Sequence, residues 1–263
     1  LPIYGLMGLK THAKLSLVVR EEGDALRRYC HVGTGNYNPK TARFYDDLGI
    51  LSSEPELGED LSKLFNELSG YSAKHDYSRI LVAPHSLRKG LLFRIRRETK
   101  NHLEGKTAWI RLKLNSLLDE EIIAALYEAA DAGVKIEIIV RGICALQFST
   151  QAQRENIKVR SILGRFLEHS RIYYFKNDGA EEYYIGSADV MHRNLDRRVE
   201  ALVRIDAEKH KDRLRRILDD SVSEKYSTWS LLDDNHWERR TRDFEGNLLV
   251  NFQDHFVEKH NRA

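Results

Sequence analysis

The stretch KTAWIRLKLNSLLDEEIIAALYEAADAGVKIEIIVRG, residues 106–142, decides the fold class. Its two ends are β-rich, and the apolar residues between them recur at helical spacing. We expect the helix to stop at Gly133, because glycine favours the position just after a helix end. A strand, a helix and a strand of these lengths form a βαβ unit, so the two strands are predicted to pair in parallel within an α/β fold.

The same alternation continues on both sides of this unit. Upstream, RILVAP (79–84) is a predicted strand, and an amphipathic helix is predicted over 85–105. Downstream, RIYYF (171–175) and EYYIGSAD (182–189) flank the turn KNDG and form a predicted hairpin, and a helix is expected near 208–222. The chain is therefore predicted to alternate strands and helices over most of its length.

Length and composition indicate two domains and exclude some function classes. At 263 residues with 41% hydrophobic residues, the chain suits two cores, which we place at residues 1–77 and 78–263. Lys and Arg total 42 against 40 Asp and Glu, a net charge of +2. A general nucleic-acid-binding protein would need a clear basic excess, so no nucleic-acid partner is expected.

The two cysteines and the hydropathy pattern bear on location. Two cysteines offer neither a disulfide framework nor a zinc spacing, which favours a reducing, cytoplasmic setting. No apolar run reaches the roughly 18 residues needed to cross a bilayer, so no transmembrane segment is expected. Peripheral association with a membrane stays open.

A histidine followed two positions later by a base occurs before two predicted hairpins. His12 precedes Lys14, and His169 precedes Arg171. The first hairpin ends in GTGNYN (33–38) and the second in GSAD (186–189). This self-similarity predicts two related domains that face each other across a pseudo-twofold axis.

These residue types are those that phosphoryl transfer requires. A neutral imidazole can attack phosphorus, and a second can move a proton near neutral pH. A base two positions along a strand points to the same side as the histidine and can neutralise phosphoryl oxygens. From this repeat geometry we add Lys14, Arg171, Asn36 and Asn38 as candidate phosphate-binding residues.

Several long strings closely resemble the polyphosphate kinase family, the bacterial enzymes that build inorganic polyphosphate from ATP. The strings are GLKTHAK (8–14), HVGTGNYNPKTARFYDDLG (31–49), LKLNSLLDEEIIAALYEAADAGVKIEIIVRGIC (112–144), RSILGRFLEHSRIYYF (160–175) and YIGSADVMHRNLDRRVE (184–200). The resemblance implies an α/β fold of two phospholipase D-like domains with mixed sheets flanked by helices. It also implies that the first domain lacks its N-terminal part, because family members carry a large region ahead of this one.

The resemblance also implies roles for individual residues. His12 matches the histidine that is phosphorylated in turnover, and His169 matches a second histidine that acts as acid or base and touches the nucleotide phosphates. Tyr45 and Arg141 match positions that contact ATP. Arg198 falls in a stretch that lines the phosphate channel.

The expected cofactor is Mg²⁺, with ligands outside this chain or only partly within it. Asp46 and Asp47 are candidate ligands, although a double Asp is as often a helix cap. The resemblance implies ATP, ADP and inorganic polyphosphate as partners and a homo-oligomer for the full-length protein. Because the N-terminal region is missing, we expect this chain alone to have weak or no ATP-dependent synthesis.

Two alternatives remain open at this level. A phospholipase D-like phosphodiesterase also uses two His-x-Lys elements, although the second base here is Arg171. A non-catalytic module that only binds polyanions is the other. No G-x-x-x-x-G-K-[ST] sequence occurs, which excludes a P-loop mechanism.

Overall fold

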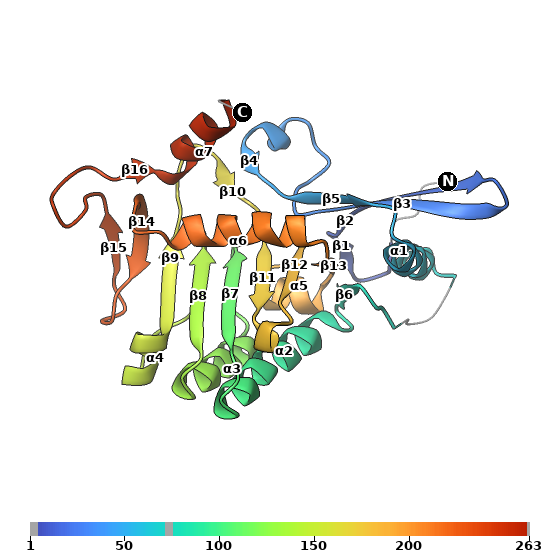
Figure 1. The fold of residues 1–263 in the computed structure, drawn as a ribbon. Coiled ribbons are helices and arrows are strands. Elements are labelled where there is room, and N and C mark those ends of the chain that lie inside the picture. Colours follow the sequence, from blue (N-terminus) through green and yellow to red (C-terminus); the bar gives the residue numbers. More distant parts are fainter. Residues whose placement is uncertain (1–4, 72–75, 262–263) are drawn as a thin grey trace.

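The computed structural model describes residues 5–71 and 76–261 and shows a mixed α/β architecture (Figure 1). The helices are α1 (Pro55–Leu68), α2 (Leu87–Leu103), α3 (Glu120–Asp131), α4 (Gln151–Asn156), α5 (His192–Asp196), α6 (Glu208–Val222) and α7 (Phe252–Asn261). The strands are β1 (Lys10–Thr11), β2 (Lys14–Glu22), β3 (Ala25–Gly33), β4 (Tyr45–Asp46), β5 (Gly49–Ser52), β6 (Ile80–Ala83), β7 (Trp109–Leu114), β8 (Lys135–Val140), β9 (Ile157–Ser161), β10 (Leu167–Glu168), β11 (Ile172–Phe175), β12 (Glu182–Gly186), β13 (Arg198–Ile205), β14 (Tyr226–Leu231), β15 (Trp237–Arg240) and β16 (Val250–Asn251).

One large mixed sheet has the order β1-β13-β12-β11-β7-β8-β9-β14-β15. The predicted βαβ unit is confirmed, because β7 and β8 pair in parallel and α3 connects them. Asp119 caps α3 by accepting a hydrogen bond from the Ile122 backbone N–H at 3.1 Å. Gly133 follows the helix end with φ of 104°, the left-handed conformation that glycine adopts without strain. β6 joins the same sheet beside β13 and is antiparallel to it.

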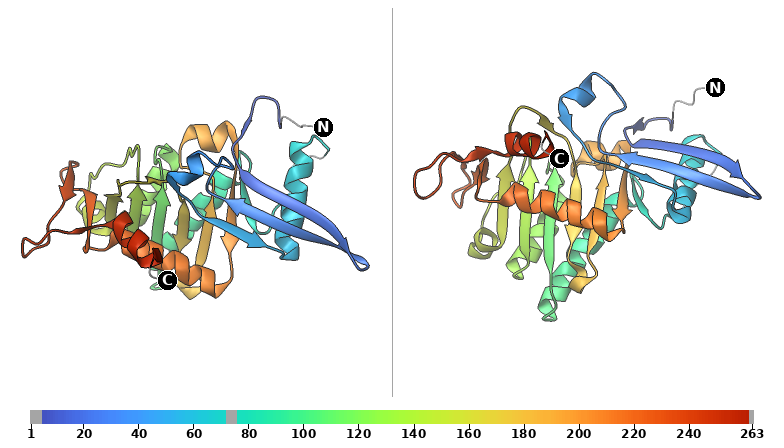
Figure 2. Two further views of the ribbon diagram at one scale, coloured as in Figure 1. Left: turned by 90° about the horizontal axis from the view of Figure 1, so that it is seen from above. Right: turned by 45° about the horizontal axis from the view of Figure 1, so that its top comes forward.

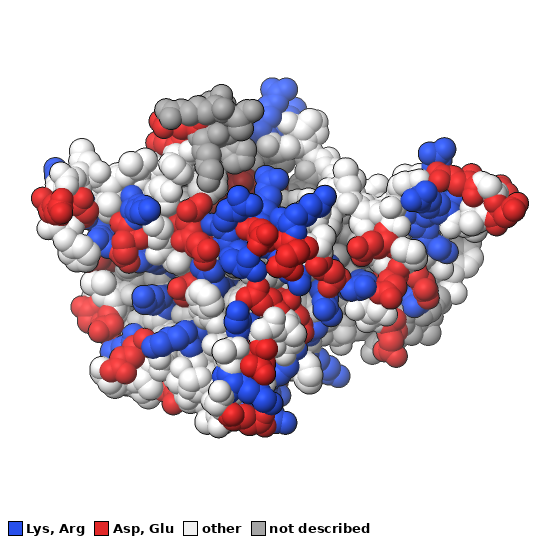
Figure 3. Space-filling model, viewed as in Figure 1, with Lys and Arg blue, Asp and Glu red and all other residues white. Residues whose placement is uncertain are grey.

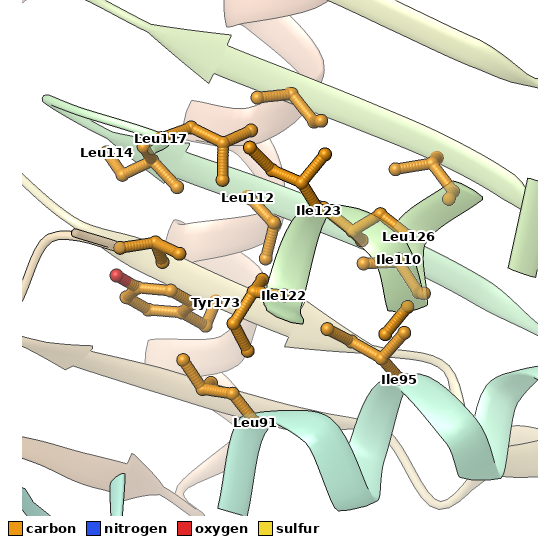
Figure 4. Packing of buried hydrophobic residues seen from close by; sticks show 14 of the residues in the cluster. Leu91, Ile95, Ile110, Leu112, Leu114, Leu117, Ile122, Ile123, Leu126 and Tyr173 are labelled. Carbon is orange, nitrogen blue, oxygen red and sulfur yellow. The ribbon is translucent and has the colours of Figure 1, made fainter. Parts of the chain in front are cut away.

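Helices cover both faces of this sheet. On β7, Ile110 and Leu112 are buried in a core that also contains the apolar sides of α2 and α3, as Figure 4 shows. Burying one such side chain contributes about 1.5–3 kcal/mol. α6 crosses the opposite face (Figure 1), where Leu214 and Leu218 pack with Tyr174. Successive side chains of β7 point to opposite faces of the sheet, so the apolar residues at alternate positions determine the face that α2 and α3 cover.

Residues 5–71 form the N-terminal half of the repeat, and residues 76–261 form the C-terminal half. The N-terminal half contributes a smaller sheet, β2-β3-β5, which is antiparallel throughout. Leu57, Leu61 and Leu64 of α1 pack against it, beside Cys30 and Val32 of β3. The β2–β3 ribbon projects from the rest of the molecule in Figures 1 and 2. β1 instead pairs in parallel with β13 of the large sheet, so residues immediately before His12 are built into the C-terminal half.

The strand pairing confirms the predicted repeat. β2–β3 and β11–β12 are both antiparallel hairpins, and each is followed by an antiparallel third strand, β5 or β13. Lys14 lies opposite Gly33 in the first hairpin. In the second hairpin Ile172 pairs with Ile185, so the same register places Arg171 opposite Gly186. The base of each motif thus faces the glycine of its own loop.

Candidate active site

His12 lies against the first residues of β13. The backbone N–H groups of His12 and Ala13 both donate to the Val199 carbonyl at 2.9 Å. This pairing brings His12 Nδ1 within 2.9 Å of the Glu200 carboxylate, which is completely buried. Asn194 Nδ2 also donates to Glu200 at 2.6 Å. A carboxylate with no solvent contact is therefore stabilised by a neutral amide and by the imidazole.

These contacts define the protonation of the His12 ring. A carboxylate can only accept, so Nδ1 carries the proton and Nε2 of the neutral ring carries the lone pair. Lys14 Nζ lies 2.9 Å from Nε2 and 2.5 Å from the His12 carbonyl oxygen, and it donates to both. The sequence prediction that Lys14 shares a side with His12 is thus matched by a direct contact.

A cavity of about 390 Å³ opens beside this histidine. His12, Lys14, Asn36 and Arg198 line it, and all four were singled out from the sequence. Burial lowers the pKa of Lys14 to about 8, opposed by Glu200 and reinforced by Arg171 and Arg198. Positive groups in a confined space that repel one another favour an anionic ligand.

The second histidine is held by a short parallel pairing between β4 and β10. His169 Nδ1 lies 2.7 Å from Asp47 Oδ1, and the Tyr45 ring centroid lies 4.9 Å from the imidazole. Burial lowers the pKa of His169 below its ordinary value, although Asp47 acts in the opposite direction. The ring is therefore mainly neutral near pH 7, with Nδ1–H donating to Asp47.

Each of the two histidines binds a carboxylate that belongs to the other half. Glu200 of the C-terminal half holds His12, and Asp47 of the N-terminal half holds His169. Asp47 follows the loop glycine Gly33 by 14 positions (47 − 33), and Glu200 follows Gly186 by 14 positions (200 − 186). The repeat therefore places equivalent carboxylates at equivalent positions, and each serves the other half.

Arg171 ties the two motifs together. It forms a bidentate pair with Asp189 at 2.9 and 3.2 Å, and its Nη1 donates to the carbonyl oxygens of His169 at 2.6 Å and Thr34 at 3.4 Å. Thr34 in turn donates its hydroxyl to Asp47 at 2.9 Å. The first Gly-rich loop and the second histidine thus belong to one continuous network.

Other predicted residues take different positions. Arg141 Nε donates to Asn115 Oδ1 at 3.2 Å and to the Glu168 carbonyl at 2.9 Å, and burial lowers its pKa. Asn38 does not join the cavity lining: its side-chain oxygen accepts from the Lys40 and Thr41 N–H groups and caps an exposed turn. This local capping accounts for an asparagine there without any ligand.

The carboxylates of the site are already bound by other side chains. Asp47 and Glu200 each accept from a histidine, and Asp189 from an arginine. Asp46 lies on the other side of β4, beside Glu168. Over residues 5–71 and 76–261, no three His, Cys, Asp or Glu side chains gather as a metal site would need. The Mg²⁺ hypothesis for Asp46 and Asp47 stays a prediction.

Sequence reasoning missed several residues of this network. The residues that bind the predicted ones but were not predicted as site residues are Glu200, Asp189, Thr34 and Asn194. Thr34 and Asp189 lie within the loop motifs GTGNYN and GSAD, whereas Glu200 and Asn194 lie outside them. Extending the repeat beyond its glycines would have found Glu200, because Asp47 holds the equivalent position.

Comparison with known proteins agrees with this geometry. Family models described as polyphosphate kinase C-terminal domain 1 and domain 2 match residues 2–74 and 80–251. A polyphosphate kinase of Streptomyces coelicolor is 54% identical over 260 residues, and one of Mycobacterium avium is 51% identical over 258. The crystal structure of polyphosphate kinase from Porphyromonas gingivalis superposes with a TM-score of 0.87 at 32% identity, covering 98% of this chain and 40% of that one.

The match is to part of longer proteins. This chain aligns over 99% of its own length with the Streptomyces relative but over 35% of that relative's length. The Mycobacterium avium comparison gives 98% and 35%. Within the described ranges, none of the helices has the length and apolar character required to cross a membrane.

Proposed function

Because the chain belongs to the polyphosphate kinase family, we propose that it carries the phosphoryl-transfer site of an enzyme that moves the γ-phosphoryl group of ATP reversibly to inorganic polyphosphate. One observation carries the proposal. His12 has one nitrogen fixed by the buried Glu200 and the other facing a cavity beside Lys14. This is the arrangement that a nucleophilic histidine needs.

In the proposed first half-reaction, Nε2 of His12 attacks the γ-phosphorus of ATP. The N–P bond forms as the bond from the γ-phosphorus to its bridging oxygen breaks, and ADP leaves with that electron pair. Lys14 moves its hydrogen bond from Nε2 to a phosphoryl oxygen, which frees the lone pair. The proton stays on Nδ1, where Glu200 balances the charge of the phosphorylated ring.

In the second half-reaction, a terminal oxygen of polyphosphate attacks the phosphorus. The new P–O bond forms while the N–P bond breaks, and the lone pair returns to Nε2 of His12. One phosphoanhydride replaces another, so the same residues serve the reverse direction. We assign to His169 the role of accepting or returning a proton at the phosphate termini through its second nitrogen, because its Nδ1 is bound to Asp47.

We further propose that the nucleotide and the phosphate chain are contacted by Tyr45, Arg141 and Arg198. Tyr45 packs on His169, and Arg198 lines the same cavity as His12. Mg²⁺ stays a predicted cofactor whose ligands are expected outside this chain or only partly within it, and the steps above name only what the residues of this chain do. Homo-oligomer formation, cytoplasmic location and weak activity of this chain alone stay predictions.

The test uses the full-length protein with His12→Ala and a matched control, His236→Ala. The His236 side chain is 81% exposed and forms an ion pair with Asp234 at the surface. We expect His12→Ala to lower both polyphosphate formation and the reverse formation of ATP by at least about a thousandfold. The control should keep both activities. Comparable activity in the two variants would refute the role of His12.

The phosphodiesterase alternative uses the same paired histidines, so it needs its own assay. Hydrolysis of a model phosphodiester by the full-length protein, at a rate that exceeds its ATP-dependent turnover, would favour it. Binding of polyphosphate without any phosphohistidine would favour the non-catalytic alternative.

A further inference from the structure

A glutamine of the C-terminal helix contacts the segment that carries His169. Gln253 is the second residue of α7 and is 5% exposed. Its Oε1 accepts from the Phe166 N–H at 2.7 Å, and its Nε2 donates to the Phe166 carbonyl at 2.8 Å. Nε2 also donates to Glu168 Oε1 at 2.7 Å. The side-chain amide thus pairs with Phe166 as a neighbouring strand would.

The segment that Gln253 contacts is short, and two arginines also bind its backbone: Arg141 donates to the Glu168 carbonyl and Arg171 to the His169 carbonyl. β10 comprises only Leu167 and Glu168, and His169 follows directly. Its strand partner is β4, through bonds from Leu167 N–H to the Phe44 carbonyl at 2.8 Å and from His169 N–H to the Asp46 carbonyl at 3.0 Å. Gln253 adds two hydrogen bonds to the backbone of Phe166, the residue directly before β10, next to the bonds that β10 makes to β4.

α7 is itself fixed to the body of the protein. Phe252 is 5% exposed, and its ring lies 5.5 Å from that of Tyr226 in β14. A Cβ at Gly164 would lie 2.4 Å from the Gln253 side-chain oxygen. Because residue 164 is glycine, the Gln253 amide can approach this segment closely. α7 therefore packs directly against the residues that precede β10.

The charges around Glu168 explain why an amide occupies position 253. Lys113 Nζ donates to Glu168 Oε2 at 2.6 Å and to Ser170 Oγ at 2.7 Å. Asp46 faces Glu168 from β4, so two carboxyl groups share one lysine. A neutral donor at 253 satisfies the second Glu168 oxygen, whereas a third carboxylate would repel both acids.

We propose that Gln253 is a positioning residue: it holds β10 in the register at which His169 meets Asp47 and Tyr45. The inference rests on the proposed function, since it assigns α7 to the support of the second histidine in phosphoryl transfer. The family-model match ends at residue 251, so the residue lies just beyond it.

The test compares Gln253→Glu and Gln253→Met with Gln151→Glu in the full-length protein. Gln253→Glu keeps the shape and one acceptor but places a carboxylate against Glu168. Gln253→Met keeps the approximate shape and loses every hydrogen bond. Gln151 is the matched control, an exposed glutamine whose amide donates to Glu155 at 2.8 Å. Thermal unfolding checks that each variant is folded.

We expect both Gln253 variants to lower kcat by about 10- to 100-fold near neutral pH, because a shift of about 1 Å in a catalytic group has effects of this size. For Gln253→Glu the loss should shrink as the pH falls below about 6, since a protonated carboxyl can again donate to Glu168. For Gln253→Met the ratio to wild type should not change with pH, and Gln151→Glu should keep full activity.

Full kcat in a folded Gln253→Met protein, or a Gln253→Glu loss that does not depend on pH, would overturn the inference. The same assay with His12→Ala separates this result from a failure of the proposed function. If His12→Ala abolishes turnover and the Gln253 variants do not alter it, only the positioning role is wrong.

Discussion

Single residues distinguish the two halves of the repeat. Lys14 and Arg171 occupy equivalent positions, but the third residue after the loop glycine is Asn36 in one half and Asp189 in the other. Asp189 neutralises Arg171 through two hydrogen bonds. Lys14 instead faces an amide across a cavity. The half that contains His12 therefore keeps a base without a carboxylate at the equivalent loop position, as the proposed phosphoryl site requires.

The lowered pKa of Lys14 predicts a pH dependence. Because the group loses its charge as the pH rises through about 8, kcat/KM of the full-length enzyme should fall on that alkaline side. Lys14→Arg should keep activity within about a factor of ten near neutral pH and move this falling limb to higher pH, since arginine stays charged. A pH profile of kcat/KM for both proteins measures this, and an unchanged limb would contradict it.

At the scale of elements, the β4–β10 pairing separates two adjacent acids. Side chains alternate along a strand, so Asp47 turns to His169 while Asp46 turns to Glu168 on the other side. The same alternation places His169 and Glu168 on opposite sides of β10. One two-residue pairing thus orders the histidine on one side and a carboxyl pair on the other.

The carboxyl pair predicts a stability change with pH. Burial and then Glu168 raise the pKa of Asp46 to about 6, so the folded state binds more protons than the unfolded state between about pH 4 and 6. Stability is therefore lost as the pH rises through this window. Asp46→Asn should gain stability relative to wild type at neutral pH, by at most about 1 kcal/mol because solvent reaches Asp46 and screens the repulsion.

Urea unfolding at about pH 4 and pH 7 measures this difference. Asp24→Asn, a change at an exposed turn residue, is the control and should leave the pH dependence unaltered. A larger advantage for Asp46→Asn at the lower pH would contradict the repulsion between the two acids.

The elements that the sequence predicts best are those with their own periodicity. β7, α3 and β8 show strand and helix spacing and a capping residue, and both hairpins end at glycines. β1, β4 and β10 comprise two residues each and depend on partners far away in the chain, so no local pattern reveals them. Glu200 is revealed only when the two halves of the repeat are compared, through its equivalence with Asp47. Asn38 resembles a site residue, although in the structure it caps a turn.

Over the whole molecule, each half supplies residues to the other. β1 enters the large sheet beside β13, and each histidine takes its carboxylate from the other half. On the surface seen in Figure 3, basic and acidic groups interleave over α6, in keeping with the small net charge. The positive groups of the proposed phosphate site gather instead at the open cavity between the halves, lined by Lys14 and Arg198.

The central claim is that Glu200 of one half selects the reacting nitrogen of His12 in the other. The most direct measurement is the phosphohistidine isomer formed when the full-length protein reacts with ATP labelled at the γ-phosphate, identified in an alkaline digest against the two standards. We expect the label on Nε2 of residue 12, because Nδ1 is bound to Glu200, and a much lower yield in Glu200→Gln. Label on Nδ1, or on another residue, would contradict the account.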